Sequence, residues 1–222
     1  MVKQLREKKK ILKGEIETLE KLQKESNIAL FQKRIEELKQ RIKKRYSETR
    51  GRLSWQSWIY KNNWLFGIHY QEPIQKQRVG FDSIPDYLFP TIDGFLDILE
   101  IKLPTAEVIL DDESHPGSYR WSSKVSEAIG QVVKYLHEIE LHQLELQQKI
   151  QRRYKDVYKS GIFSIKPRAF ILIGSKDGWH EEKLEAFRKL NYSLHGIEIL
   201  TYSDLLDRGN QIVEMYSKRI EE

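Results

Sequence analysis

The sequence predicts an α/β protein in which a mixed β-sheet is flanked by helices and preceded by a helical arm. Apolar residues in the first 50 positions recur at heptad spacing, as in a helix with one buried stripe. Short apolar runs then follow one another, bounded by Pro73, Gly80 and the Asp93-Gly94 turn, as in an antiparallel meander. A long amphipathic pattern leads into the apolar run AFILIG, which is typical of a buried strand that returns to the sheet.

Composition restricts the class of protein. The chain has 222 residues, 39% hydrophobic and 11% aromatic, enough for a sizeable core. It contains no cysteine, which excludes disulfides and thiolate metal sites and fits a reducing compartment. There is no secretory signal pattern and no run of about 18 apolar residues. We therefore expect a soluble cytoplasmic protein without a membrane span.

Residues 1–50 form a basic arm. They carry 16 Lys and Arg against 8 Asp and Glu, a net charge of +8, whereas the remainder carries 22 against 25, a net charge of −3. Two a/d registers are present: Val2, Leu5, Leu12, Ile16 and Leu19, then Ile28, Phe31, Ile35, Leu38 and Ile42. Their phase slips near Ser26-Asn27, which predicts a broken coiled coil or a helical hairpin. The charge indicates nucleic acid or a merely solvated surface, and the apolar stripe favours a homo-oligomer, a dimer or a tetramer.

The body is expected to span residues 51–222. We predict helices at 53–62, 122–158, 179–190 and 203–219, strands at 64–70, 74–80, 86–92, 95–102, 169–174 and 196–201, and a polar loop at 103–122. The helix that follows this loop begins at Ser122 or Ser123, a favourable N-cap.

The strand FLDILEIK ends with two charged side chains. Because side chains alternate along a strand, Ile98, Glu100 and Lys102 share one face, and Asp97 lies on the other, where we expect a structural role. Pairing around the Asp93-Gly94 turn places Asp86 roughly opposite Glu100. Buried charges are costly unless they pair or hold a metal.

Two carboxylates and a lysine suit phosphodiester hydrolysis. Asp86 and Glu100 are oxygen ligands for Mg²⁺, for which Mn²⁺ could substitute, and Lys102 could act on the attacking water or on the phosphate. A cross-strand salt bridge at a sheet edge would produce the same pattern, and the spacing alone leaves both interpretations open.

Six strings in series give the chain a resemblance to a known family. WQSWIYKNNWLFG, PDYLF, DILEIKLP, SSKVSEAIGQVVKYL, AFILIG and IEILTYSDLL resemble the nuclease domain of the Shedu anti-phage defence family, within the PD-(D/E)xK nuclease superfamily. The resemblance implies a restriction-endonuclease-like fold and metal-dependent DNA cleavage. It also implies a place for Gln131 in the active site, on the helix after the lysine. The acid that such nucleases often carry in their first helix is missing from LSWQSW; Gln56 could fill part of that role or pack structurally, and Glu48 lies far upstream.

Three hypotheses follow. The first is a Mg²⁺-dependent DNA endonuclease of anti-phage defence, with Asp86 and Glu100 as metal ligands and Lys102 and Gln131 as further catalytic residues. The second is a catalytically silent nucleic-acid-binding or oligomerisation module with the same fold. The third is an RNA-cleaving or nicking variant, because such a centre handles a phosphate and is indifferent to the sugar.

Overall fold

The computed structural model describes residues 2–80, 82–158, 161–163 and 166–221, without the side chains of residues 2–11, 17–21, 24 and 219–221. The chain divides into two compact units, residues 1–43 with 206–222 and residues 44–205. None of the helices in the part of the chain described combines the length and the apolar character needed to cross a membrane.

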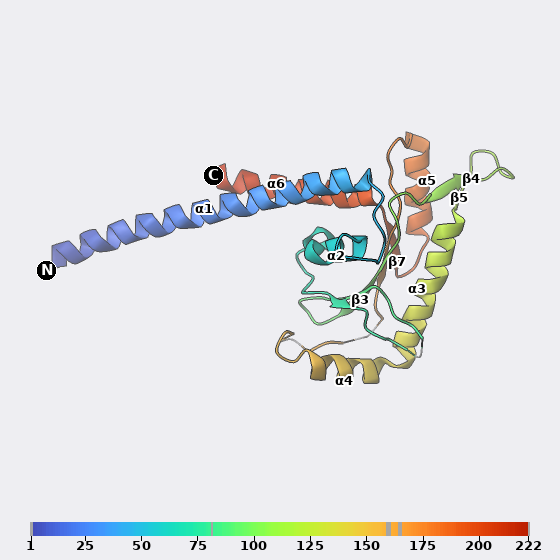
Figure 1. Cartoon of the computed structure of the whole chain (residues 1–222), viewed down its shortest axis with the longest axis horizontal. Helices are drawn as coiled ribbons and strands as arrows, with labels where there is room; N and C mark the ends of the chain where they lie inside the picture. Colours follow the sequence, from blue (N-terminus) through green and yellow to red (C-terminus); the bar gives the residue numbers. More distant parts are fainter. Residues whose placement is uncertain (1, 81, 159–160, 164–165, 222) are drawn as a thin grey trace. The chain divides into compact units, whose positions relative to one another are not determined.

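The first unit consists of helix α1 (Val2–Ile42) and most of α6 (Tyr202–Glu221), which run alongside each other (Figure 1). Because α1 continues through positions 26 and 27, the alternative of a helical hairpin is wrong. In the second a/d register Leu38 is fully buried and Phe31 contacts the ring of Tyr216 at 6.5 Å. In the first register Leu12 and Ile16 are more than half exposed, while the side chains of Val2, Leu5 and Leu19 lie outside the described residues.

The second unit is built on a mixed sheet. Its strands are β1 (Ile74–Gln75), β2 (Tyr87–Pro90), β3 (Leu96–Ile101), β6 (Ala169–Leu172) and β7 (Ile197–Leu200), in the spatial order β1-β2-β3-β6-β7. The first three strands pair antiparallel, and β3, β6 and β7 pair parallel. The predicted α/β architecture with a mixed sheet flanked by helices is therefore confirmed, and β3 is its central strand.

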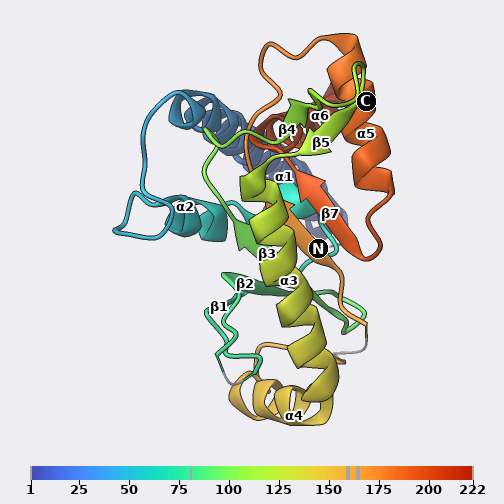
Figure 2. The same ribbon diagram turned by 90° about the vertical axis from the view of Figure 1, so that its right-hand side faces the viewer.

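Helices cover both faces of this sheet. Helix α3 (Ser123–Leu141) begins after Ser122, whose hydroxyl accepts the backbone N–H of Val125, and it packs on the face that carries Leu88 and Ile98. Helix α2 (Trp55–Lys61) packs on the opposite face, which carries Tyr87 and Phe89. On that face Trp55 contacts Tyr202 at 4.5 Å between ring centroids. Helix α5 (Glu181–Tyr192) is the remaining helix between β6 and β7. Figure 2 shows α3 crossing the sheet, with α4 (Gln143–Arg153) at its lower end.

Four predicted elements differ from the structure. The strand expected at 74–80 is reduced to its first two residues, β1 (Ile74–Gln75). Residues 64–70 are not a strand, since a short 3₁₀ helix, η1 (Asn63–Phe66), continues α2. The expected polar loop contains a hairpin of β4 (Ile109–Asp111) and β5 (Tyr119–Trp121), whose Trp121 packs on Phe187. The long helix predicted over 122–158 changes direction at His142, which brings Leu146 and Ile150 of α4 into the same core as α3.

Candidate active site

The register of β2 and β3 brings the two acidic residues of the pattern together. Tyr87 pairs with Leu99, so the next position outward sets Asp86 opposite Glu100, as the turn at Asp93-Gly94 predicted. One Asp86 oxygen, Oδ2, accepts the backbone N–H of Ile101 at 2.9 Å, which ties this carboxylate to the end of β3. The strand pairing thus fixes both acids at one point on the sheet.

Gln56 supports Asp86 from the other side. Its side-chain amide donates to Asp86 Oδ1, and the residue is 2% exposed. Helix α2 holds it there because the Ser54 hydroxyl caps the helix and Tyr87 donates its hydroxyl to the Gln56 carbonyl at 2.8 Å. Both Asp86 oxygens keep further lone pairs for another ligand.

Glu100 is a buried carboxylate with one unsatisfied oxygen. The residue is 3% exposed, and its Oε1 accepts from Lys102 Nζ at 2.7 Å. Its Oε2 is buried and has no hydrogen-bond partner among the described residues. Burial and the neighbouring Asp86 charge raise the pKa of Glu100 to about 7, and together they outweigh the opposite effect of Lys102.

Lys102 joins β3 to the helix on that face. Its ammonium contacts both Glu100 and the side-chain oxygen of Gln131, the latter at 3.0 Å. Its backbone N–H donates to Leu172 of β6, and its carbonyl accepts the Tyr202 hydroxyl at 2.7 Å. Burial opposes the charged form, but Glu100 holds the pKa of Lys102 above its ordinary value, so the side chain is a cation at neutral pH.

Gln131 is oriented by a second residue of α3. Its amide nitrogen donates to the Tyr135 hydroxyl at 2.5 Å, while its oxygen accepts from Lys102. Tyr135 lies one turn further along the helix and is 6% exposed. The structure therefore brings together all four residues singled out in the sequence, Asp86, Glu100, Lys102 and Gln131, and adds Tyr135 to them.

Glu48 also reaches the site, although the sequence separates it from the other acids. The backbone N–H of Gln56 donates to the Glu48 carbonyl at 3.0 Å, because the chain turns back at Gly51, whose φ is +85°. Burial is the main cause that raises the pKa of Glu48, with Lys102 and Asp86 as its charged neighbours. Glu48, Lys102 and Gln131 line one open hollow of about 430 Å³. The Arg50-Gly51 pair ahead of the Ser54 cap was the signal for this reversal.

Two other residues from the sequence have structural explanations. Asp97, on the opposite face from Glu100, accepts from Arg168 at 2.7 Å and from the Tyr70 hydroxyl at 2.7 Å. Gly174 follows β6 with a φ of +66°, and a Cβ atom there would lie 2.3 Å from Val108 Cγ2. Close packing therefore accounts for this glycine.

The chemistry of the site fits a hard divalent cation. Among the described residues, no group of three or more His, Asp or Glu side chains is arranged to hold a metal. Mg²⁺ is commonly bound by one or two carboxylates, with water and substrate phosphates completing its octahedron. Asp86 and Glu100 provide two such carboxylates, and Glu100 Oε2, which has no hydrogen-bond partner among the described residues, could act as a buried oxygen ligand.

Comparison with protein-family models identifies the family of the chain. A family model described as "Shedu protein SduA, C-terminal" matches residues 53–206. The chain belongs to the Shedu family. The Shedu match includes Asp86, Glu100, Lys102 and Gln131 and begins five residues after Glu48. Shedu proteins are an anti-phage defence family associated with nuclease activity. No curated protein matches this Shedu chain.

Proposed function

We propose that the chain is a metal-dependent DNA endonuclease with a restriction-endonuclease-like fold, acting in the cytoplasm in anti-phage defence. The observation that carries the proposal is Glu100 Oε2, a buried oxygen without a partner among the described residues, beside Asp86 and Lys102. An unpaired buried carboxylate oxygen is destabilising, and active sites are where proteins retain such groups. A salt bridge alone would leave that oxygen unexplained.

Asp86 and Glu100 would hold Mg²⁺ or Mn²⁺. When bound, such an ion neutralises charge on the scissile phosphate and lowers the pKa of its water. Asp86 is held for this role by Ile101 and Gln56, so its carboxylate is oriented before any ion arrives. Glu48 lies close enough to interact electrostatically with Asp86, and it supplies a further acid at the hollow.

Lys102 acts on the phosphate in this proposal. Because Glu100 keeps the ammonium charged, Lys102 is suited to stabilising negative charge on the transferring phosphate and poorly suited to removing a proton from water. Gln131 accepts a hydrogen bond from Lys102 at 3.0 Å and donates to Tyr135, which holds the ammonium over the hollow. The same amide can position the attacking water.

Incubation of closed circular DNA with the full chain tests the proposal. With Mg²⁺ or Mn²⁺ we expect cleavage that EDTA abolishes, and a loss of about 100-fold or more in rate for Lys102→Ala. Glu185→Gln, on an exposed acid of α5, is the matched control and should cleave normally. Undiminished cleavage by Lys102→Ala would remove the mechanism.

A catalytically silent module is the second candidate. The observation in its favour is the same finding that no group of three His, Asp or Glu among the described residues is arranged for a metal. Calorimetric titration with Mn²⁺ separates the two functions. Binding that Glu100→Ala abolishes supports the nuclease, and absence of binding at millimolar metal supports the silent module. Parallel incubations with RNA, and gels that resolve nicked from linear DNA, decide the substrate and the mode of cutting.

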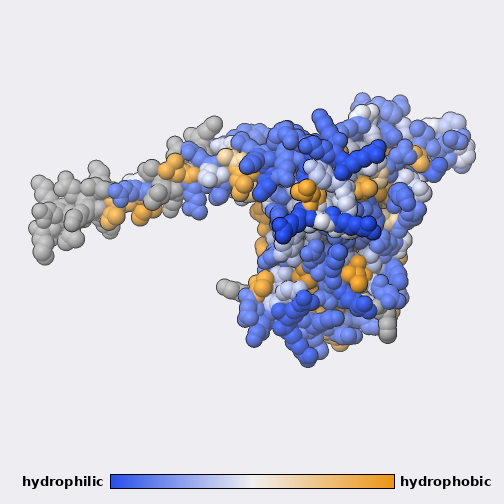
Figure 3. All heavy atoms as spheres, in the orientation of Figure 1, coloured by the Kyte–Doolittle hydropathy of each residue, from blue (hydrophilic) through white to orange (hydrophobic). Residues whose placement is uncertain are grey.

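We also propose that α1 assembles the chain into a homo-oligomer. Leu12, Ile16, Leu22 and Leu30 of α1 are each about half exposed or more, although they are large and apolar. Figure 3 shows hydrophobic side chains on the surface of this arm. Such a stripe favours a partner helix. The full chain should sediment as a dimer or tetramer, and Leu12→Lys with Ile16→Lys should reduce its mass; an unchanged mass would place the interface elsewhere.

A further inference from the structure

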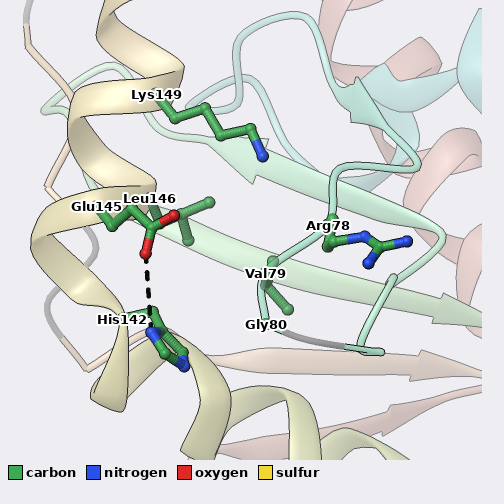
Figure 4. Close-up of a pocket in the computed structure, with 7 residues that line it drawn as sticks. All are labelled: Arg78, Val79, Gly80, His142, Glu145, Leu146 and Lys149. Atoms are coloured by element: carbon green, nitrogen blue, oxygen red, sulfur yellow. Dashed lines mark ion pairs between the residues drawn. The ribbon is translucent and has the colours of Figure 1, made fainter.

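Two adjoining hollows lie along α4, in the unit that carries the site. The first, of about 210 Å³, lies between the turn at residues 78–80 and α4, and the second, of about 450 Å³, continues along α4. Figure 4 shows Lys149 extending from α4 across the first hollow toward the segment that carries Arg78. Lys149 also lines the second hollow, together with Arg152 and Arg153. The two hollows therefore form one continuous surface.

This surface is strongly basic. Arg78, Lys149, Arg152 and Arg153 are all exposed there, and Glu145 is the one acid among the described residues that lines the two hollows. Among the residues that the structure describes, no carboxylate lies within ion-pair distance of Lys149 or Arg152. The nearby acids Glu138 and Glu145 lie instead against His142, at 3.6 and 3.9 Å. Lys149 and Arg152 consequently remain available to an anion from outside.

The helix dipole explains part of this pattern and leaves part unexplained. Cations are favourable in the last turn of a helix, which accounts for Arg152 and Arg153 without any ligand. Lys149 lies a turn earlier, and Arg78 comes from a separate segment on the other side of the hollow. Convergence of cations from two elements is therefore the feature that calls for a ligand.

The facing segment connects this surface to the candidate active site. The backbone N–H of Lys76 donates to the Asp86 carbonyl at 3.1 Å, and that of Val79 donates to the Ser83 carbonyl at 2.9 Å. Gly80 lets this turn approach α3, because a Cβ atom there would lie 2.0 Å from the Glu138 carboxylate. Lys76 and Arg78 are thus held on a fixed turn that leads from Asp86 toward α4.

We propose that Lys76, Arg78, Lys149, Arg152 and Arg153, the basic strip, bind the sugar-phosphate backbone of DNA beside the strand presented to Asp86 and Glu100. The choice of DNA rests on the proposed nuclease function. A row of phosphates is a regularly spaced polyanion, and it can engage cations distributed along a strip in a way that a single anion cannot. Arginine further offers planar donors that match phosphate oxygens.

Fluorescence anisotropy of a short labelled DNA duplex, measured in EDTA over a range of salt concentrations, tests the strip. EDTA prevents metal-dependent cleavage, so binding is measured whether or not the protein is a nuclease. The variant is Lys149→Ala with Arg152→Ala in the full chain, and the matched control is Arg188→Ala with Lys189→Ala on α5, which removes the same charge from another exposed helix. Lys76→Ala with Arg78→Ala probes the facing segment independently.

Loss of two phosphate contacts lowers the slope of log K against log salt by about 1.8 and weakens binding about 60-fold near 0.1 M salt. We expect this for the α4 pair, a similar loss for the Lys76 and Arg78 pair, and less than about a threefold change for the α5 control. Equal losses in the α4 and α5 pairs, or wild-type binding by the α4 pair, would overturn the proposal. Competition by polyglutamate as effective as that by DNA would also overturn it, in favour of an acidic protein partner. If the protein does not cleave DNA but these binding differences are found, the proposed nuclease activity is refuted and the proposed DNA binding by the basic strip is retained.

Discussion

Replacing Glu100 with glutamine should stabilise the metal-free protein at alkaline pH. Glu100 is 3% exposed, and burial and Asp86 raise its pKa from the ordinary 4.5 to about 7. A raised carboxylate pKa means that the folded state binds more protons than the unfolded state between these two values, so stability falls as pH rises from about 4.5 to 7. At about 1.4 kcal/mol per pH unit, the total is about 3 kcal/mol.

Glutamine mimics the protonated acid and removes that cost. Glu100→Gln should therefore equal the wild type within about 1 kcal/mol at pH 5 and exceed it by about 3 kcal/mol at pH 8. Urea denaturation in EDTA, followed by tryptophan fluorescence, measures the difference, and all five tryptophans lie within residues 44–205. Glu185→Gln, on an exposed acid, should match the wild type within experimental error at both pH values. A Glu100→Gln protein less stable than the wild type at pH 8 would show that the buried Glu100 carboxylate does not destabilise the fold.

Three further predictions concern the same unit. Mn²⁺ affinity should rise about tenfold per pH unit up to pH 7 and then level off, because the ion must displace the Glu100 proton; calorimetry showing equal affinity at pH 6 and pH 8 would contradict this. Asp97→Ala should cost about 2 kcal/mol in urea denaturation, since it strands the Tyr70 hydroxyl and Arg168, yet leave cleavage by the folded protein unchanged; a loss of cleavage at full folding would assign Asp97 to the site. Tyr135→Phe should lower the cleavage rate about tenfold with little change in stability, because Gln131 loses its orienting partner; an unchanged rate would show that Gln131 needs no such support.

The central part of the site was predictable because its information is local. Alternation along residues 95–102 assigns Glu100 and Lys102 to one face and Asp97 to the other, and the Asp93-Gly94 turn sets the register that pairs Tyr87 with Leu99. Helix spacing after Ser122 likewise placed Gln131 on α3, but its place in the candidate site came from the resemblance to the Shedu family. The other inferences each needed a short stretch of chain and one periodicity.

Other parts of the site depend on contacts between distant segments. Glu48 approaches Lys102 because the chain reverses at Gly51 and the carbonyls of Ser47 and Glu48 accept backbone N–H groups from the start of α2. No periodic pattern in the sequence predicts this reversal. The β4–β5 hairpin was missed for the same reason. Its strands are short and polar, and they are stabilised by the contact of Trp121 with Phe187 of α5. The change of direction at His142 follows from burial of Leu146 and Ile150 in a core that the helix pattern does not describe. Tertiary packing decided these elements.

A crystal of the protein soaked in Mn²⁺ and measured for anomalous scattering tests the proposed metal site most directly. We expect one strong peak within about 2.2 Å of an oxygen of Asp86 and of Glu100 Oε2. The peak should be lost in Glu100→Gln. Manganese bound elsewhere, in a protein that still cleaves DNA with this metal, would contradict the claim that these two carboxylates form the catalytic centre.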